Sequence, residues 1–232
     1  MMQALILAGG LGTRLGAITK QIPKPMVPIN GRPFLEIQME YLRENGITDI
    51  VLSVGYLGDQ IEEYFGDGSG MGLKIEYSFE DVPVGTGGGV KLAADKLHEE
   101  FFLLYGDSYL PIDYREVEEA FKASGKTGLL VAYDNRLGDT TVPCNLSVDS
   151  DMLVTEYRKD AKSEELHLVE AGVLAFKKSV LDLIPNTGPT SLEEEVFARL
   201  IADKEMACFT TRQRFYDIGL PERLEKLEEL FR

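Results

Sequence analysis

An apolar run near the N-terminus of this 232-residue chain, residues 4–8, ends in a glycine-rich loop. The loop glycines are Gly9, Gly10 and Gly12. A backbone without Cβ atoms can turn sharply and bring its N–H groups close to an anion. Arg14 and Lys24 place positive charge beside the same loop. These residue types at this spacing predict a nucleotide-phosphate site in which Arg14 and Lys24 neutralise charge during catalysis.

Two aspartates are candidates for holding a metal ion that bridges phosphates. Asp107 directly follows the apolar segment 101–105, at the position where open α/β sheets place groups that contact ligands. Asp217 precedes an Ile-Gly pair near the end of the chain. Carboxylate oxygens suit Mg²⁺, which keeps several water ligands. For Asp107 the alternative is a turn or a helix N-cap, because Gly-Asp-Ser is common in turns, and for Asp217 it is an Asp-x-Gly turn.

A second glycine-rich segment spans residues 80–89. Its glycines are Gly85 and residues 87–89, and a helical pattern follows them. Such a backbone allows close approach to a ligand and offers free N–H groups at the start of a helix. The alternative is a flexible loop that binds nothing.

The composition restricts the class of substrate. Acidic residues number 39 and basic residues 24, which gives a net charge of -15. A surface of that sign repels nucleic acid and anionic membranes, so a free nucleotide is a better substrate than a polynucleotide. Cys144 and Cys208 are too few for a disulfide framework, and the first apolar run is too short for a signal peptide or a membrane span. We therefore expect a single cytoplasmic domain over residues 1–232.

Strand and helix patterns alternate through the first half of the chain, in the βαβ order that produces a parallel sheet with helices on both faces. The expected strands are residues 4–8, 49–54, 73–79, 101–105, 128–133 and 173–176. The expected helices are residues 33–45, 58–65, 86–96 and 221–232. Segments 144–148 and 152–158 alternate in polarity and predict an antiparallel pair. A further helix should begin at Ser191, because Glu194 follows at the spacing of a capping box.

The segment Gly9-Gly10-Leu11-Gly12-Thr13-Arg14-Leu15, followed by Pro23-Lys24-Pro25, closely resembles the signature of the sugar-phosphate nucleotidyltransferases. The resemblance covers most of the chain and implies a Rossmann-like, doubly wound, mostly parallel mixed sheet in a three-layer α/β/α fold. It also implies transfer of a nucleotidyl group from a nucleoside triphosphate to a sugar 1-phosphate, with release of pyrophosphate. The residues that it places at the nucleotide are Leu7, Gly9, Gly10, Gly12, Thr13, Glu80, Gly85 and Thr86.

The same resemblance implies sites for Mg²⁺ and for the sugar phosphate. Asp107 and Asp217 match the GD and D-x-G motifs with which the family holds Mg²⁺. Lys159 stands where many relatives carry the lysine of a Glu-Lys-Pro motif that contacts the sugar phosphate, although neither Glu nor Pro is present here. Lys162 is the alternative. The residues expected around the sugar are Asn145, Glu170 and Gly172.

Among short members of the family, the chain looks most like the D-glycero-D-manno-heptose 1-phosphate guanylyltransferases, which implies a heptose destined for cell-surface polysaccharide. Glu80 favours GTP, because a carboxylate only accepts hydrogen bonds and guanine offers it two adjacent donors. A UTP- or CTP-dependent transferase acting on another sugar or alditol phosphate remains open. So do a non-catalytic subunit that senses nucleotide sugars, and assembly as a homodimer.

Overall fold

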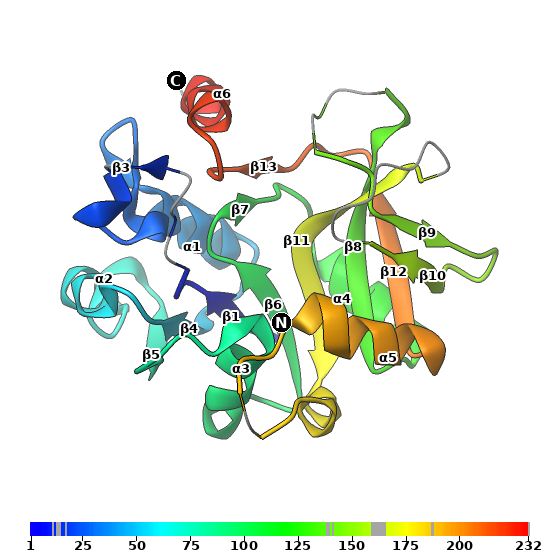
Figure 1. Ribbon diagram of the computed structural model, residues 1–232. Coiled ribbons are helices and arrows are strands. Elements are labelled where there is room, and N and C mark those ends of the chain that lie inside the picture. The colour runs from blue at the N-terminus through cyan, green and yellow to red at the C-terminus, as the bar shows by residue number, and fades with distance from the viewer. Residues whose placement is uncertain are drawn as a thin grey trace.

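The computed structural model describes residues 1–10, 12, 15–16, 18–137, 140, 142–158, 166–186 and 188–231. Its elements alternate as the βαβ pattern predicts (Figure 1). The strands are β1 (Gln3–Leu7), β2 (Pro28–Ile29), β3 (Arg32–Pro33), β4 (Asp49–Val54), β5 (Lys74–Phe79), β6 (Glu100–Tyr105), β7 (Ser108–Tyr109), β8 (Gly128–Asp134), β9 (Leu146–Val148), β10 (Val154–Tyr157), β11 (Leu168–Lys177), β12 (Met206–Thr211) and β13 (Tyr216–Asp217). The α-helices are α1 (Phe34–Glu44), α2 (Gly58–Phe65), α3 (Gly85–Leu92), α4 (Tyr114–Ser124), α5 (Phe197–Ala202) and α6 (Pro221–Leu230).

The main sheet has nine strands within the described residues, and its longest path runs β10-β9-β11-β6-β1-β4-β5. Strands β6, β1, β4 and β5 run parallel to one another. Strand β11 runs antiparallel to β6 on one side and to β8 on the other, and β8 carries β12 in parallel. The predicted antiparallel pair is confirmed as β9 and β10. The sheet is therefore mixed, with a parallel half of the doubly wound kind.

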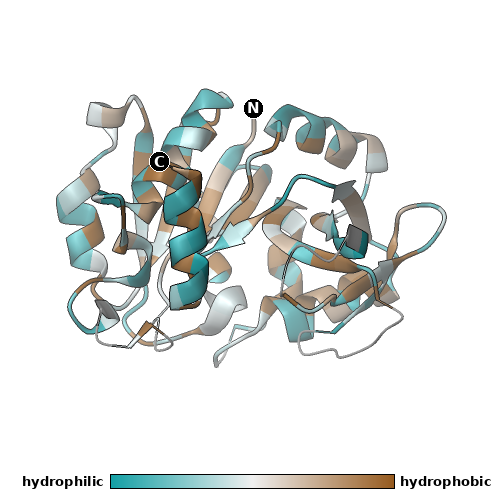
Figure 2. Cartoon of the chain, turned by 90° about the horizontal axis from the view of Figure 1, so that it is seen from above, coloured by the Kyte–Doolittle hydropathy of each residue, from teal (hydrophilic) through white to brown (hydrophobic). Residues whose placement is uncertain are grey.

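Helices cover both faces of the sheet, as the alternation along β1 requires. Ala4 and Ile6 pack in one apolar cluster with residues of α1, α2 and α4. Leu5, between them, packs in a second cluster with residues of α3 and α5. Seen from above, the helices carry hydrophilic residues outward and the strands between them are largely hydrophobic (Figure 2). The three-layer α/β/α prediction is confirmed.

Helix α4 is an element that the sequence patterns did not predict. Asp113 caps it by accepting a hydrogen bond from the backbone N of Arg115 at 2.9 Å, and Gly125 ends it in a left-handed conformation. Its buried apolar residues are Tyr114, Val117 and Phe121. Five of the eleven residues of α4 are charged, and its apolar residues form one stripe that packs on the core.

The helix expected at Ser191 begins as a π-helix, Leu192–Val196, and continues as α5. Ser191 Oγ accepts a hydrogen bond from Glu194 N at 3.2 Å, as a capping box predicts. The reciprocal bond differs, because Ser191 N donates to Glu195 Oε1 at 3.2 Å rather than to Glu194. A π turn is wider than an α turn, so the residue four positions on lies over the cap.

Cys144 and Cys208 are both free thiols. Among the described residues, no helix combines the length and the apolar character that crossing a membrane requires.

Candidate active site

The carboxyl ends of β1, β5 and β6 border a cavity of about 430 Å³. Strands β4 and β6 lie on opposite sides of β1, so the cavity is at the point where the order of the strands reverses, the usual ligand site of such sheets. The volume is within the range of roughly 300–1,000 Å³ that small-molecule sites occupy. The predicted site residues that line it are Leu7, Gly9, Gly10, Gly12, Lys24, Glu80, Gly85, Thr86 and Asp107.

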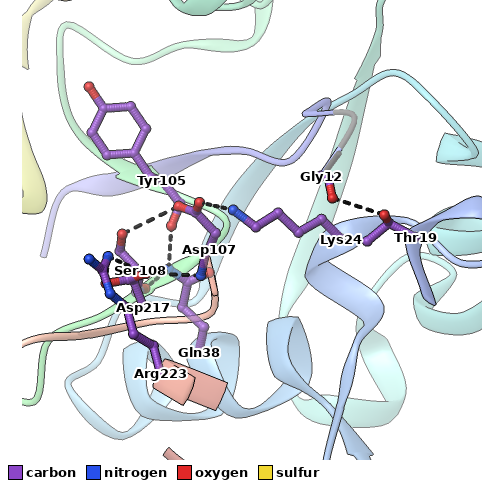
Figure 3. A network of polar contacts seen from close by, with 10 residues as sticks. Gly12, Thr19, Lys24, Gln38, Tyr105, Asp107, Ser108, Asp217 and Arg223 are labelled. Atoms are coloured by element: carbon purple, nitrogen blue, oxygen red, sulfur yellow. Dashed lines mark hydrogen bonds and ion pairs between the residues drawn. The ribbon is translucent and has the colours of Figure 1, made fainter. Parts of the chain in front are cut away.

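The glycine loop is held against the Lys24 segment. Gly12 has a φ of 61°, and a Cβ there would lie 2.9 Å from Lys24 Cβ, so a side chain at this position would be strained and would clash. Thr19 Oγ1 donates a hydrogen bond to Gly12 O at 2.9 Å (Figure 3). The predicted contacts of Thr13 and Arg14 lie outside the described residues.

Lys24 and Asp107 form an ion pair within the cavity (Figure 3). Lys24 begins the 3-10 turn Lys24–Met26, and Asp107 lies in the turn between β6 and β7. Ser108 Oγ also donates to Asp107 Oδ1, at 3.3 Å. The Lys24 side chain is 13% exposed and that of Asp107 34%, so the carboxylate remains accessible to a ligand. The pair brings a cation and a carboxylate together at the cavity lining.

Asp217 lies next to the Asp107 turn, but its carboxylate is already engaged. Strand β13 pairs with β7 so that Asp217 is opposite Ser108, and Ile218 N donates to Asp107 O at 3.0 Å. Arg223 Nη1, from α6, donates to the two carboxylate oxygens of Asp217 at 2.9 and 3.1 Å. Asp217 does not line the cavity.

The carboxylates at the site suit Mg²⁺ better than a metal ion that is held entirely by protein ligands. No cluster of three or more His, Cys, Asp or Glu residues able to hold a metal occurs in the described part of the chain. Mg²⁺ is commonly bound through one or two carboxylates together with water and substrate phosphates. Asp107 fits that requirement, and Asp217 would have to exchange its bonds to Arg223 for a bond to the metal.

The residues expected around the sugar come together outside the cavity lining. Asn145 Oδ1 accepts a hydrogen bond from Glu170 N at 2.9 Å, and Glu170 Oε1 accepts one from Gly172 N at 2.6 Å. A Cβ on Gly172 would lie 2.5 Å from Ser108 Cβ, so the cluster lies against the Asp107 turn. The hydrogen bond from Gly172 N to the Glu170 carboxylate supports β11 at the point where its register with β8 shifts. Lys159, with its alternative Lys162, falls outside the described residues.

Glu80 turns toward the cavity. Its carboxylate accepts hydrogen bonds from Ser53 Oγ at 3.3 Å and from Val84 N at 3.4 Å. A Cβ on Gly9 would lie 2.8 Å from Glu80 Oε1, so glycine there leaves room for the carboxylate. Burial raises the pKa of Glu80, and its two hydrogen bonds offset part of the rise. Both bonds are long, which leaves the carboxylate able to accept further donors.

The sequence matches the family model described as nucleotidyl transferase over residues 3–231. The chain belongs to this family. It is 35% identical over 221 residues to the D-glycero-alpha-D-manno-heptose 1-phosphate guanylyltransferase of Campylobacter jejuni, covering 95% of this chain and 96% of that protein. It is 33% identical over 224 residues to the mannose-1-phosphate guanylyltransferase of Mycobacterium tuberculosis, covering 95% of this chain and 62% of that protein.

Solved structures agree with the family. The crystal structure of HddC from Yersinia pseudotuberculosis superposes with a TM-score of 0.84 and 30% sequence identity, over 100% of both chains. HddC complexed with GMP-PN superposes with a TM-score of 0.81. The predicted fold, family and enzyme class are thereby confirmed: the protein is a nucleotidyltransferase.

The residues of the transferase site that were not predicted include Tyr105, Glu193 and Gln38. Tyr105 lines the cavity, Glu193 lies behind it, and Gln38 supports the Asp107 turn. Gln38 is 3% exposed, and its Nε2 donates to Tyr105 O at 3.0 Å and to Ser108 O at 2.7 Å. A polar residue one helical turn after Phe34, on the buried side of α1, is the sequence signal that could have identified it.

Replacing Gln38 with Glu should destabilise the transferase. The carboxylate would face two carbonyl oxygens with no donor, and we expect the free energy of unfolding to fall by at least about 1–3 kcal/mol. The loss should be smaller at acidic pH, because the introduced carboxyl group can donate one hydrogen bond once it is protonated. Urea unfolding at several pH values measures it. Gln213→Glu is the control, since the Gln213 side chain is exposed and its replacement should change stability by less than about 0.5 kcal/mol. Equal stability of the two variants would contradict the role assigned to Gln38.

Proposed function

We propose that this transferase moves a guanylyl group from GTP to a heptose 1-phosphate and releases pyrophosphate. The observation that carries the proposal is the Glu80 carboxylate, which lies at the cavity with acceptor capacity to spare. Guanine presents its N1–H and its exocyclic amine side by side, and a carboxylate can accept from both. The Campylobacter relative is named for this reaction, and HddC binds GMP-PN.

Mannose 1-phosphate is the second candidate acceptor, because the Mycobacterium relative is named for it. That protein is longer, and this chain covers 62% of it. The Campylobacter relative is covered over 96% of its length, which favours heptose. A cytoplasmic location, a homodimer and a role in cell-surface polysaccharide remain predictions.

The reaction needs no covalent nucleophile on the protein. An ionised oxygen of the sugar phosphate attacks the α-phosphorus of the triphosphate in line, forming a P–O bond as the bond to the β-phosphate breaks and pyrophosphate departs. The protein aligns the two substrates and neutralises charge that develops at the phosphorus. We assign this task to Lys24, which lines the cavity, and to Arg14, which is assigned it from the sequence. Asp107 and Asp217 would hold Mg²⁺, which supplies charge neutralisation at the phosphates when bound.

Replacing Glu80 with Gln should weaken the preference for GTP over UTP. The amide would point a donor at guanine or offer only one acceptor, and we expect the ratio of kcat/KM for GTP to that for UTP to fall by about tenfold. Pyrophosphate release with each nucleotide measures the ratio. Asp81→Asn is the matched control, because Asp81 is the exposed neighbour and should leave the ratio unchanged.

The same carboxylate predicts a pH dependence. The pKa of Glu80 is raised, so the carboxylate gains a proton as pH falls through a value above the ordinary 4.5. Protonation removes acceptor capacity, and kcat/KM for GTP should therefore fall relative to UTP on the acidic side. Glu80→Gln should lack this decline. A wild-type enzyme that prefers UTP, or an unchanged nucleotide ranking in Glu80→Gln, would contradict guanine recognition by Glu80 while leaving the family intact.

A further inference from the structure

Glu193 lies behind the cavity wall and accepts hydrogen bonds from three hydroxyl groups. Its Oε1 accepts from Tyr105 Oη at 2.7 Å. Its Oε2 accepts from Thr86 Oγ1 at 2.9 Å and from Ser191 Oγ at 2.8 Å. The residue is 8% exposed, so these donors replace the water that a carboxylate otherwise needs. Tyr105 and Thr86 both line the cavity, and one buried carboxylate thus connects two parts of its wall.

The segment that carries Glu193 is docked on the first turn of α3. Thr190 N donates to Val84 O and Gly87 N donates to Thr190 O, each at 2.8 Å. A Cβ on Gly85 would lie 2.4 Å from Thr190 O, so the two backbones are in direct contact. The π-helix begins immediately after this contact. π-helices occur frequently at functional sites, and this one fixes the position of a carboxylate relative to the cavity.

These contacts determine whether the hydroxyl groups of Thr86 and Tyr105 act as donors or as acceptors toward a ligand. The Thr86 hydroxyl donates to Glu193 and accepts from Leu192 N at 2.9 Å, which leaves one lone pair. The Tyr105 hydroxyl donates to Glu193, which leaves its oxygen as an acceptor. A hydroxyl whose proton is committed can only accept from a ligand.

We propose that Glu193 is a positioning residue that orients the hydroxyls of Thr86 and Tyr105 as hydrogen-bond acceptors toward the bound nucleotide. This inference rests on the proposed function, since it concerns the same cavity. Thr86, Tyr105 and Glu80 form what we call the acceptor wall of the cavity. This wall receives ribose hydroxyls or base N–H groups and disfavours phosphate oxygens. Lys24, which also lines the cavity, attracts the phosphates. These acceptors and Lys24 together fix which way round the nucleotide enters.

Glu193→Gln tests the inference, because an amide has one acceptor oxygen and must turn its NH₂ toward at least one hydroxyl. That hydroxyl is then free to donate into the cavity. We expect the dissociation constant of the nucleotide, measured by calorimetry without sugar phosphate, to rise about tenfold, and its KM to rise similarly with kcat changed much less. Glu194→Gln is the matched control, since Glu194 is the exposed neighbour and should bind nucleotide as the wild type does.

A second comparison keeps the inference testable if Glu193→Gln folds poorly. Thr86→Val should raise the dissociation constant about as much as Glu193→Gln, and Thr86→Ser should keep it near the wild-type value. Adding Glu193→Gln to a Thr86→Val, Tyr105→Phe protein should change binding by less than about twofold, because no oriented hydroxyl is left. A folded Glu193→Gln protein with wild-type affinity would overturn the inference. It would also be overturned if Glu193→Gln raised the dissociation constant of the Thr86→Val, Tyr105→Phe protein by the same factor as that of the wild type.

Each variant is tested with all four nucleoside triphosphates. Failure of the inference about Glu193 can then be distinguished from failure of the proposed function. The wild-type ranking of the four reports the base and thus tests guanine recognition. The ratio of Glu193→Gln to wild type for the nucleotide that binds best tests the acceptor wall, whichever base that nucleotide carries.

Discussion

Lys24→Ala is expected to reduce turnover by about 10²-fold or more, which is typical of losing one preorganised group that stabilises transition-state charge. The Lys24 side chain is 13% exposed and pairs with Asp107. Among the residues that the structure describes, Lys24 is the cation that lines the cavity and can meet the phosphates of a nucleotide. Stability should change little, because Asp107 is 34% exposed and can be hydrated when its partner is lost. Arg14→Ala should behave alike, an expectation that rests on the sequence alone.

Turnover of Lys24→Ala is measured as pyrophosphate release at saturating substrates, with the folded fraction matched by circular dichroism. Lys20→Ala is the control, because Lys20 is an exposed lysine of the neighbouring 3-10 turn, Ile18–Lys20. It should turn over like the wild type. Near-normal turnover of Lys24→Ala at matched folding would remove Lys24 from the catalytic site.

Asp107→Asn is expected to reduce activity by a comparable factor, about 10²-fold or more, and to raise the Mg²⁺ concentration needed for half-maximal activity. The change preserves shape but removes the charge that the cation requires. EDTA should abolish wild-type activity and Mg²⁺ should restore it. Binding of Mn²⁺ to the Asp107→Asn protein, followed by electron paramagnetic resonance, gives a second readout that does not depend on turnover.

Asp217→Asn provides the comparison for Asp107→Asn. Its carboxylate is already bonded to Arg223, so we expect a smaller increase in the Mg²⁺ requirement and a loss of stability at the β13–α6 junction. An Asp107→Asn protein that responds normally to Mg²⁺ would show that Asp107 has a structural role only.

The parts of the site that the sequence predicted are those built from short segments. Gly9, Gly10 and Gly12 follow a buried strand, and Asp107 follows another, so local pattern alone places them at the carboxyl ends of parallel strands. The rules of doubly wound sheets then bring these ends together at one cavity. Lys24 lies at the same cavity, because its segment packs against the glycine loop at Gly12.

The parts that the sequence did not predict depend on contacts between distant segments. Glu193 stands among three successive glutamates, and only its packing against Thr86 and Tyr105 distinguishes it from Glu194 and Glu195. The pairing of Asp217 with a residue of α6 likewise follows from how the last helix packs. Single-sequence patterns carry no information about such partners.

The most direct test of the account is a screen of the four nucleoside triphosphates against a panel of sugar 1-phosphates that includes heptose and mannose 1-phosphates, read by pyrophosphate release. We predict that release requires both substrates and is fastest with GTP and D-glycero-D-manno-heptose 1-phosphate. Release with UTP or CTP in preference to GTP would contradict the guanylyl assignment. Absence of release with every pair, from a folded protein that binds nucleotide, would contradict catalysis itself.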